Sequence, residues 1–70
     1  MKKYLVVFEK TETGYSAYVP DLEGCVATGS TKDVAKQNIY EAIRLHIEGM
    51  EEEGLSIPAG RADSEVLVFN

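Results

Sequence analysis

The chain has 70 residues, which make one small domain that buries only about 60% of its unfolded surface, so self-association would add stability. An apolar content of 44% excludes a disordered chain, and every apolar run is far shorter than a membrane span. Twelve acidic against seven basic residues give a net charge of −5, which disfavours contact with phosphate backbones and favours a basic protein partner.

Two strands are predicted at the start of the chain. Lys3–Glu9 is rich in β-branched and aromatic residues, and both of its alternating sets are apolar, which is typical of a central strand. The polar stretch Lys10–Gly14 predicts a turn. Tyr15–Val19 then alternates in the manner of a second strand, so a hairpin is expected.

A corner is predicted after the hairpin. Pro20 ends the second strand, and Asp21 favours a turn because its side chain can bond to nearby backbone. Gly24 supplies a backbone conformation that other residues avoid. Cys25–Thr28 is then predicted to form a short third strand.

One long helix is predicted after Gly29. Ser30 or Thr31 is suited to the N-cap position, and the apolar residues that follow recur at helical spacing to about Glu53. Gly54 is the expected C-cap. One face of this helix should therefore pack on the sheet.

A last strand is predicted at Glu65–Phe69, parallel to the first strand and beside it at the sheet edge. We therefore expect an α+β domain with the element order βββαβ, a four-stranded mixed sheet in the order 3-2-1-4 and one long helix on one face. Strands one and four are apolar on both faces, and a single helix covers only one face of the sheet. We thus expect a homo-oligomer, a dimer or larger, with Val66 and Val68 in its interface.

The run GYSAYVPDLEGCVATGST at 14–31 and the helix NIYEAIRLHIEGMEEEG at 38–54, with IP at 57–58, resemble the N-terminal domain of HicB-type antitoxins. The resemblance covers nearly the whole chain. It implies a degraded ribonuclease-H-like fold without nuclease activity, which binds and neutralises a small, basic, double-stranded-RNA-binding-like toxin that cleaves mRNA. Val34 stands where the family usually has a second acid. We expect a single stand-alone domain, 1–70, without a C-terminal DNA-binding domain, and we do not expect operator binding.

The acids, Cys25 and His46 are residue types that can serve catalysis or metal binding. A two-metal nuclease needs acids that converge from several strands, whereas Asp21 and Glu23 have only scattered partners, in Glu9, Glu41 and Glu65. Cys25 is better explained as a buried strand residue than as a nucleophile, and His46 as a core residue of the helix. We predict no catalytic residue, no metal ligand and no cofactor.

The partner-binding candidates are residues that combine exposure with aromatic or acidic character: Tyr18, Asp21, Glu23 and Tyr40. Structural roles are assigned to the turn and cap residues Pro20, Gly24, Gly29, Thr31 and Gly54. A lone cysteine fits a reducing cytoplasm. Two other functions stay open at this point: an orphan module that only self-associates, and a minimal metal-dependent nuclease.

Overall fold

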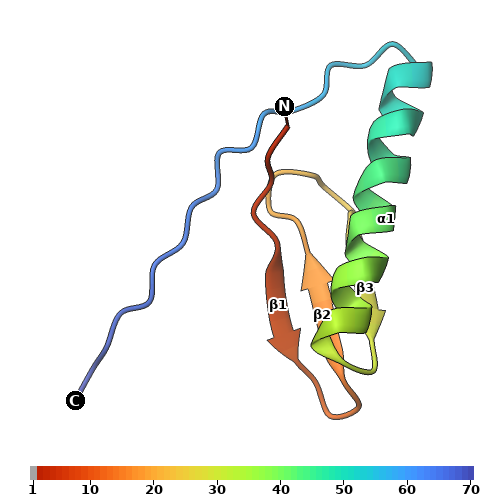
Figure 1. The fold of residues 1–70 in the computed structure, drawn as a ribbon. Coiled ribbons are helices and arrows are strands. Elements are labelled where there is room, and N and C mark those ends of the chain that lie inside the picture. The colour runs from red at the N-terminus through yellow and green to blue at the C-terminus, as the bar shows by residue number, and fades with distance from the viewer. Residues whose placement is uncertain (1) are drawn as a thin grey trace.

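A computed structural model describes residues 2–70, and its ribbon is drawn in Figure 1. The elements are the strands β1 (Val7–Lys10), β2 (Tyr15–Tyr18) and β3 (Val26–Gly29), followed by the helix α1 (Lys32–Glu52). Within residues 2–70, no helix is both long enough and apolar enough to cross a membrane.

The three strands form an antiparallel meander in the order β1-β2-β3. Phe8, Ala17 and Ala27 lie opposite one another across the sheet, and so do Val7, Tyr18 and Val26 in the next row. Residues 3–6 extend β1 backwards without a partner, because β2 ends at Tyr18 and the chain turns at Pro20. The first strand is therefore shorter than predicted.

The helix α1 begins and ends with two capping motifs. The Thr31 hydroxyl accepts a 3.1 Å hydrogen bond from the Val34 amide, which makes Thr31 the N-cap. At the other end, Gly54 has φ +69°, and its amide donates to the Glu51 carbonyl. The Leu55 amide donates to the Met50 carbonyl, which completes a Schellman motif.

The core lies between α1 and the sheet, and mainly beneath β2 and β3. Its buried side chains are Ala17, Val19, Leu22, Cys25, Ala35 and Ile39. The helix approaches β3 closely at Gly29, where a Cβ atom would lie 2.3 Å from the Ala35 nitrogen. This contact requires glycine, and it fixes the start of α1 against the end of β3.

The predicted four-stranded mixed sheet in the order 3-2-1-4 is wrong. The sheet is three-stranded and antiparallel, and Glu65–Phe69 is extended chain that pairs with no strand in residues 2–70. Figure 1 shows this segment running away from β1 towards the C-terminus. Its sequence has the composition of a strand, but a strand forms only where its backbone finds a hydrogen-bonding neighbour.

Candidate functional site

The corner between β2 and β3 places three apolar residues in the core. The Leu22 amide donates to the Val19 carbonyl, and the Cys25 amide donates to the Leu22 carbonyl, both at 3.1 Å. A third bond runs from the Val19 amide to the Cys25 carbonyl at 3.2 Å. Gly24 has φ +78° with open space where a Cβ would stand, so its backbone conformation is what calls for glycine.

Asp21 holds the segment that follows the helix. Its Oδ2 atom accepts hydrogen bonds from the backbone amides of Arg61 and Ala62, each 2.8 Å long. We call these two bonds the clamp. They lower the pKa of the Asp21 carboxyl, the bond from Ala62 most, and the Arg61 charge lowers it further. Asp21 was predicted to contact a partner, but its Oδ2 atom is already bonded within the chain.

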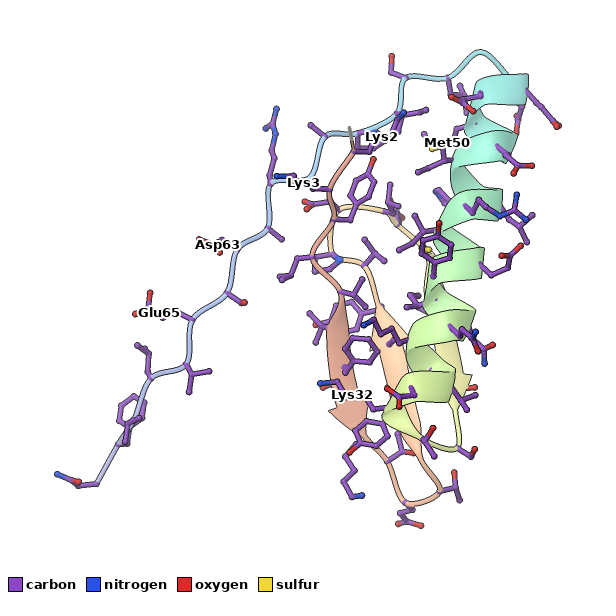
Figure 2. The ribbon with its side chains drawn as sticks, in the orientation of Figure 1. Lys2, Lys3, Lys32, Met50, Asp63 and Glu65 are labelled. Atoms are coloured by element: carbon purple, nitrogen blue, oxygen red, sulfur yellow. The ribbon has the colours of Figure 1, made fainter. Side chains whose placement is uncertain are left out.

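The segment before the clamp crosses the start of the chain at close range. The Tyr4 hydroxyl donates to the Pro58 carbonyl at 2.5 Å. A Cβ on Gly60 would lie 1.8 Å from the Lys3 carbonyl oxygen, so only glycine permits this crossing. Figure 2 shows Lys2 and Lys3 beside the crossing and the side chains of Asp63 and Glu65 beyond it. Residues 58–62 are therefore attached to the body at several points.

Beyond the clamp, Asp63–Asn70 forms an extended segment that we call the tail. Its apolar residues are among the most exposed of the described chain: Val66 is 89% exposed, Leu67 67%, Val68 90% and Phe69 84%. The structure thus places the two predicted interface residues, Val66 and Val68, in solvent.

An open groove of about 590 Å³ lies between the first strand and the helix. One wall is formed by Tyr4, Val6 and Phe8, and the other by the helical residues Ile39, Tyr40 and Ile43, so the lining is largely apolar. Lys2 and Lys36 also line it, together with Asp33. The groove exists because α1 lies mainly over β2 and β3 and leaves the β1 edge of the sheet uncovered.

The sheet face that points away from α1 carries a second apolar surface, which we call the open face. Tyr18 lies in register with Val7 on one side and Val26 on the other, so these three side chains form a row across the sheet. Val26 is 66% exposed and Tyr18 39%. The neighbouring row, Glu9, Ser16 and Thr28, is polar.

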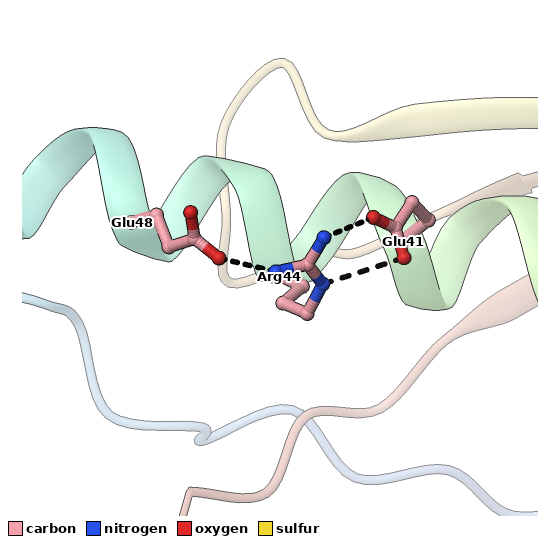
Figure 3. A network of polar contacts seen from close by, with 3 residues as sticks. All are labelled: Glu41, Arg44 and Glu48. Atoms are coloured by element: carbon pink, nitrogen blue, oxygen red, sulfur yellow. Dashed lines mark hydrogen bonds and ion pairs between the residues drawn. The ribbon is translucent and has the colours of Figure 1, made fainter.

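The outer side of α1 carries a network of charges, shown in Figure 3. Arg44 bonds to Glu41 and to Glu48, one turn before and one turn after it on the helix. The hydrogen bond from Arg44 lowers the pKa of the Glu41 carboxyl. The Arg44 guanidinium is therefore engaged with carboxylates.

Two lysines lie over aromatic rings. The ammonium of Lys10 is 5.3 Å from the centre of the Tyr15 ring, and that of Lys32 is 5.2 Å from the centre of the Phe8 ring. Both distances are typical of cation–π contacts. With Arg44, three of the seven basic residues thus have partners within the chain.

The titratable residues considered for chemistry lie apart from one another. In residues 2–70, no three His, Cys, Asp or Glu side chains are grouped so as to hold a metal ion. Cys25 is buried in the core, and burial raises the pKa of its thiol, which keeps the thiol protonated. His46 is half-buried on the helix.

The four predicted partner residues do not form one surface. Tyr18 is on the open face, Asp21 and exposed Glu23 are at the corner, and Tyr40, 68% exposed, lines the groove. The groove and the clamp were not predicted, because both depend on contacts between residues distant in the sequence. Gly60 is a local signal only of the crossing at Lys3, where a Cβ atom would not fit.

A family profile described as "HicB_like antitoxin of bacterial toxin-antitoxin system" matches residues 4–67. The chain belongs to the HicB-like antitoxin family. A UPF0150 protein of Thermoplasma acidophilum is 44% identical over 62 residues, which cover 87% of this chain and 90% of that protein. A UPF0150 protein of Helicobacter pylori is 46% identical over 50 residues, 71% of this chain and 69% of that protein.

Two further matches are a longer phage protein and a chain of a solved complex. An uncharacterized 14.9 kDa protein of Haemophilus phage HP1 is 44% identical over 55 residues, which are 79% of this chain but only 41% of the phage protein. A chain of the solved "HicA3 and HicB3 toxin-antitoxin complex" shares the fold with a TM-score of 0.72 and 35% identity. The match covers 86% of this HicB-like chain and 70% of that one. The family and this structural match support an antitoxin role.

Proposed function

We propose that this HicB-like protein is an antitoxin that binds a small, basic, mRNA-cleaving toxin and occludes its active surface. The observation that carries the proposal is the family match over residues 4–67, joined to the structural match with a chain of a toxin–antitoxin complex. In this role the protein acts by binding alone, as a single HicB-like domain with a degraded ribonuclease-H-like fold, and needs no cofactor. Its place of action is the cytoplasm, where mRNA is translated.

The open face is the surface that we assign to the toxin. Tyr18 and Val26 present aromatic and branched side chains to solvent, and such residues anchor protein interfaces. Glu9 lies in the adjacent row of the sheet, and exposed Glu23 is at the nearby corner. The net charge of −5 supports attraction of a basic partner and raises its rate of encounter.

Charge argues that this protein does not contact the toxin's RNA substrate. Binding to a phosphate backbone needs clustered free Lys and Arg side chains. Arg44 is paired with two glutamates, and Lys10 and Lys32 lie over aromatic rings. Inhibition should therefore come from covering the toxin and not from competition for RNA.

A metal-dependent nuclease is a weaker alternative. Asp21 is the first candidate for a metal-binding acid of such a nuclease, and its Oδ2 atom is bonded to two backbone amides. If Asp21→Asn abolished magnesium-dependent RNA cleavage by the pure protein, the nuclease function would replace the antitoxin proposal.

The experiment begins with the reading frame next to the gene. If that reading frame encodes a short basic protein, the candidate toxin, it is co-expressed with this chain. We expect the two proteins to purify together and the RNA cleavage by the candidate toxin to stop. Val26→Lys should weaken toxin binding at least about tenfold, because a charged side chain would replace an interface residue. Leu45→Lys is the matched control, since Leu45 is 55% exposed on α1 and outside the open face.

Two results would contradict the proposal. If the basic product neither binds this chain nor loses its RNA cleavage, the protein is better described as a self-associating module. If Val26→Lys and Leu45→Lys weaken toxin binding equally, the toxin binds elsewhere than the open face.

A further inference from the structure

We propose that the tail of one copy adds as a strand to the free edge of the first strand in a second copy, with its side chains in that copy's groove, and that the exchange is reciprocal. This inference does not depend on the proposed toxin. It starts from two unsatisfied features of the same chain: a tail with four exposed apolar residues, and a sheet edge with an apolar groove beside it.

The dimensions of the two features agree. The tail, Asp63–Asn70, spans roughly 26 Å at about 3.3 Å per residue in an extended strand. Gly60 of the same chain lies against Lys3 and Tyr4, so the uncovered edge is residues 5–10, which is long enough for residues 65–70 of the tail. Among residues 2–70, the only strand beside β1 is β2, on its other side. An added strand would satisfy a row of backbone amides and carbonyls on both segments.

The side chains of the tail suit this position. Val66 and Val68 alternate with Leu67 and Phe69, so both faces of the tail are apolar. In the proposed pairing, the strand beside β1 turns the face with Val66 and Val68 to the groove walls at Ile39, Tyr40 and Ile43. The other face would then continue the apolar surface on which Val7 lies.

Charge also favours this occupant. The tail carries Asp63 and Glu65 and has no basic residue. Lys2 and Lys36 line the groove, and Asp33 is its only acidic lining residue among those described. An acidic strand therefore meets a groove with a small excess of positive charge, which disfavours repulsion between the two copies.

The clamp explains why the tail reaches a second copy and not its own edge. Asp21 fixes Arg61 and Ala62, and Gly60 is pressed against the Lys3 carbonyl, so the tail leaves the body from a fixed short hinge. Figure 1 shows that its direction diverges from β1 of the same chain. A short, fixed hinge that directs a segment away from its own body favours exchange between copies.

Sedimentation and multi-angle light scattering of the full chain test the assembly. We expect a mass of about twice the 7.7 kDa of one chain. Val68→Lys should raise the dimer dissociation constant at least about tenfold, because it places an ammonium in an apolar groove. Ser64→Lys, which adds the same charge to the tail outside its apolar run, should leave the dissociation constant nearly unchanged.

A second pair of variants tests the groove itself. Tyr40→Lys changes an exposed lining residue and should weaken the dimer, whereas Leu45→Lys changes an exposed helix residue outside the lining and should not. Pairing of two tails with each other would leave the Tyr40→Lys dimer intact. Such a result would overturn the proposal.

Isotope-filtered NMR separates exchange from docking of a tail onto its own chain. In an equal mixture of labelled and unlabelled copies, we expect contacts between the tail methyl groups of Val66 or Val68 and the Tyr40 ring of the other copy. We also expect slow hydrogen exchange at the tail amides. A monomer at all concentrations up to about 200 µM, or tail-to-groove contacts only within one chain, would overturn the proposal.

Discussion

Replacing Leu22 by alanine should remove a large part of the stability of the domain. Leu22 is 1% exposed and packs with Val19, Cys25 and Ile39 in the core. Truncation of a buried leucine to alanine costs about 2–5 kcal/mol, from lost burial and from the cavity that remains. A domain of this length has a total unfolding free energy of roughly 3.5–10 kcal/mol. The variant should thus lose at least a fifth of that free energy, and at the upper limit all of it.

Urea unfolding followed by circular dichroism measures this loss. All variants are compared at one protein concentration, because self-association would shift the midpoint. Glu23→Ala is the matched control, since Glu23 is the next residue in the same corner but is exposed. We expect a melting temperature at least about 8 °C lower for Leu22→Ala, and little change for the control. A loss below about 1 kcal/mol, or equal losses for both variants, would show that the corner does not anchor the core.

Lowering the pH should release the clamp only below pH 3.8, because the amides of Ala62 and Arg61 hold the pKa of the Asp21 carboxyl below that value. The clamp contributes its full stability to the folded protein above pH 3.8, and this contribution is lost as the pH falls through the pKa of Asp21 in the folded protein. An NMR titration of these two amides with a midpoint above 3.8 would contradict this. Cys25 should react with a thiol reagent only on unfolding, because burial raises its pKa, and rapid labelling of the native protein would disprove the packing of the corner. Duplex RNA and DNA should not shift in a gel at near-physiological salt, and the affinity for a basic partner should fall as salt rises.

Local signals predicted most of the body of the domain. The Thr31 hydroxyl can cap the start of a helix, and Gly54 can adopt the positive φ that ends one, and neither property depends on distant residues. The helix lies between these two residues. The hairpin was predictable for a similar reason, because strand alternation and turn composition are read within about fifteen residues.

The errors concern contacts between distant residues. The tail has the composition of a strand, but no local pattern shows that Arg61 and Ala62 are held by a carboxylate 40 residues earlier. Asp21 lies in a turn, as its sequence context predicts, but its side chain bonds to the amides of Arg61 and Ala62 and not to nearby backbone. Those partners lie beyond any sequence window. Leu22 lies between two turn-forming acids, which concealed its place in the core.

The apolar run Val66–Phe69 also has a colloidal consequence. Any copy whose tail is unpaired presents a short, apolar, β-prone segment together with a free sheet edge, and this combination can nucleate fibrous aggregates. Mutual repulsion at a net charge of −5 opposes such growth at neutral pH. Near the isoelectric point of about 4.7 that repulsion vanishes, so mildly acidic preparations are where turbidity should first develop.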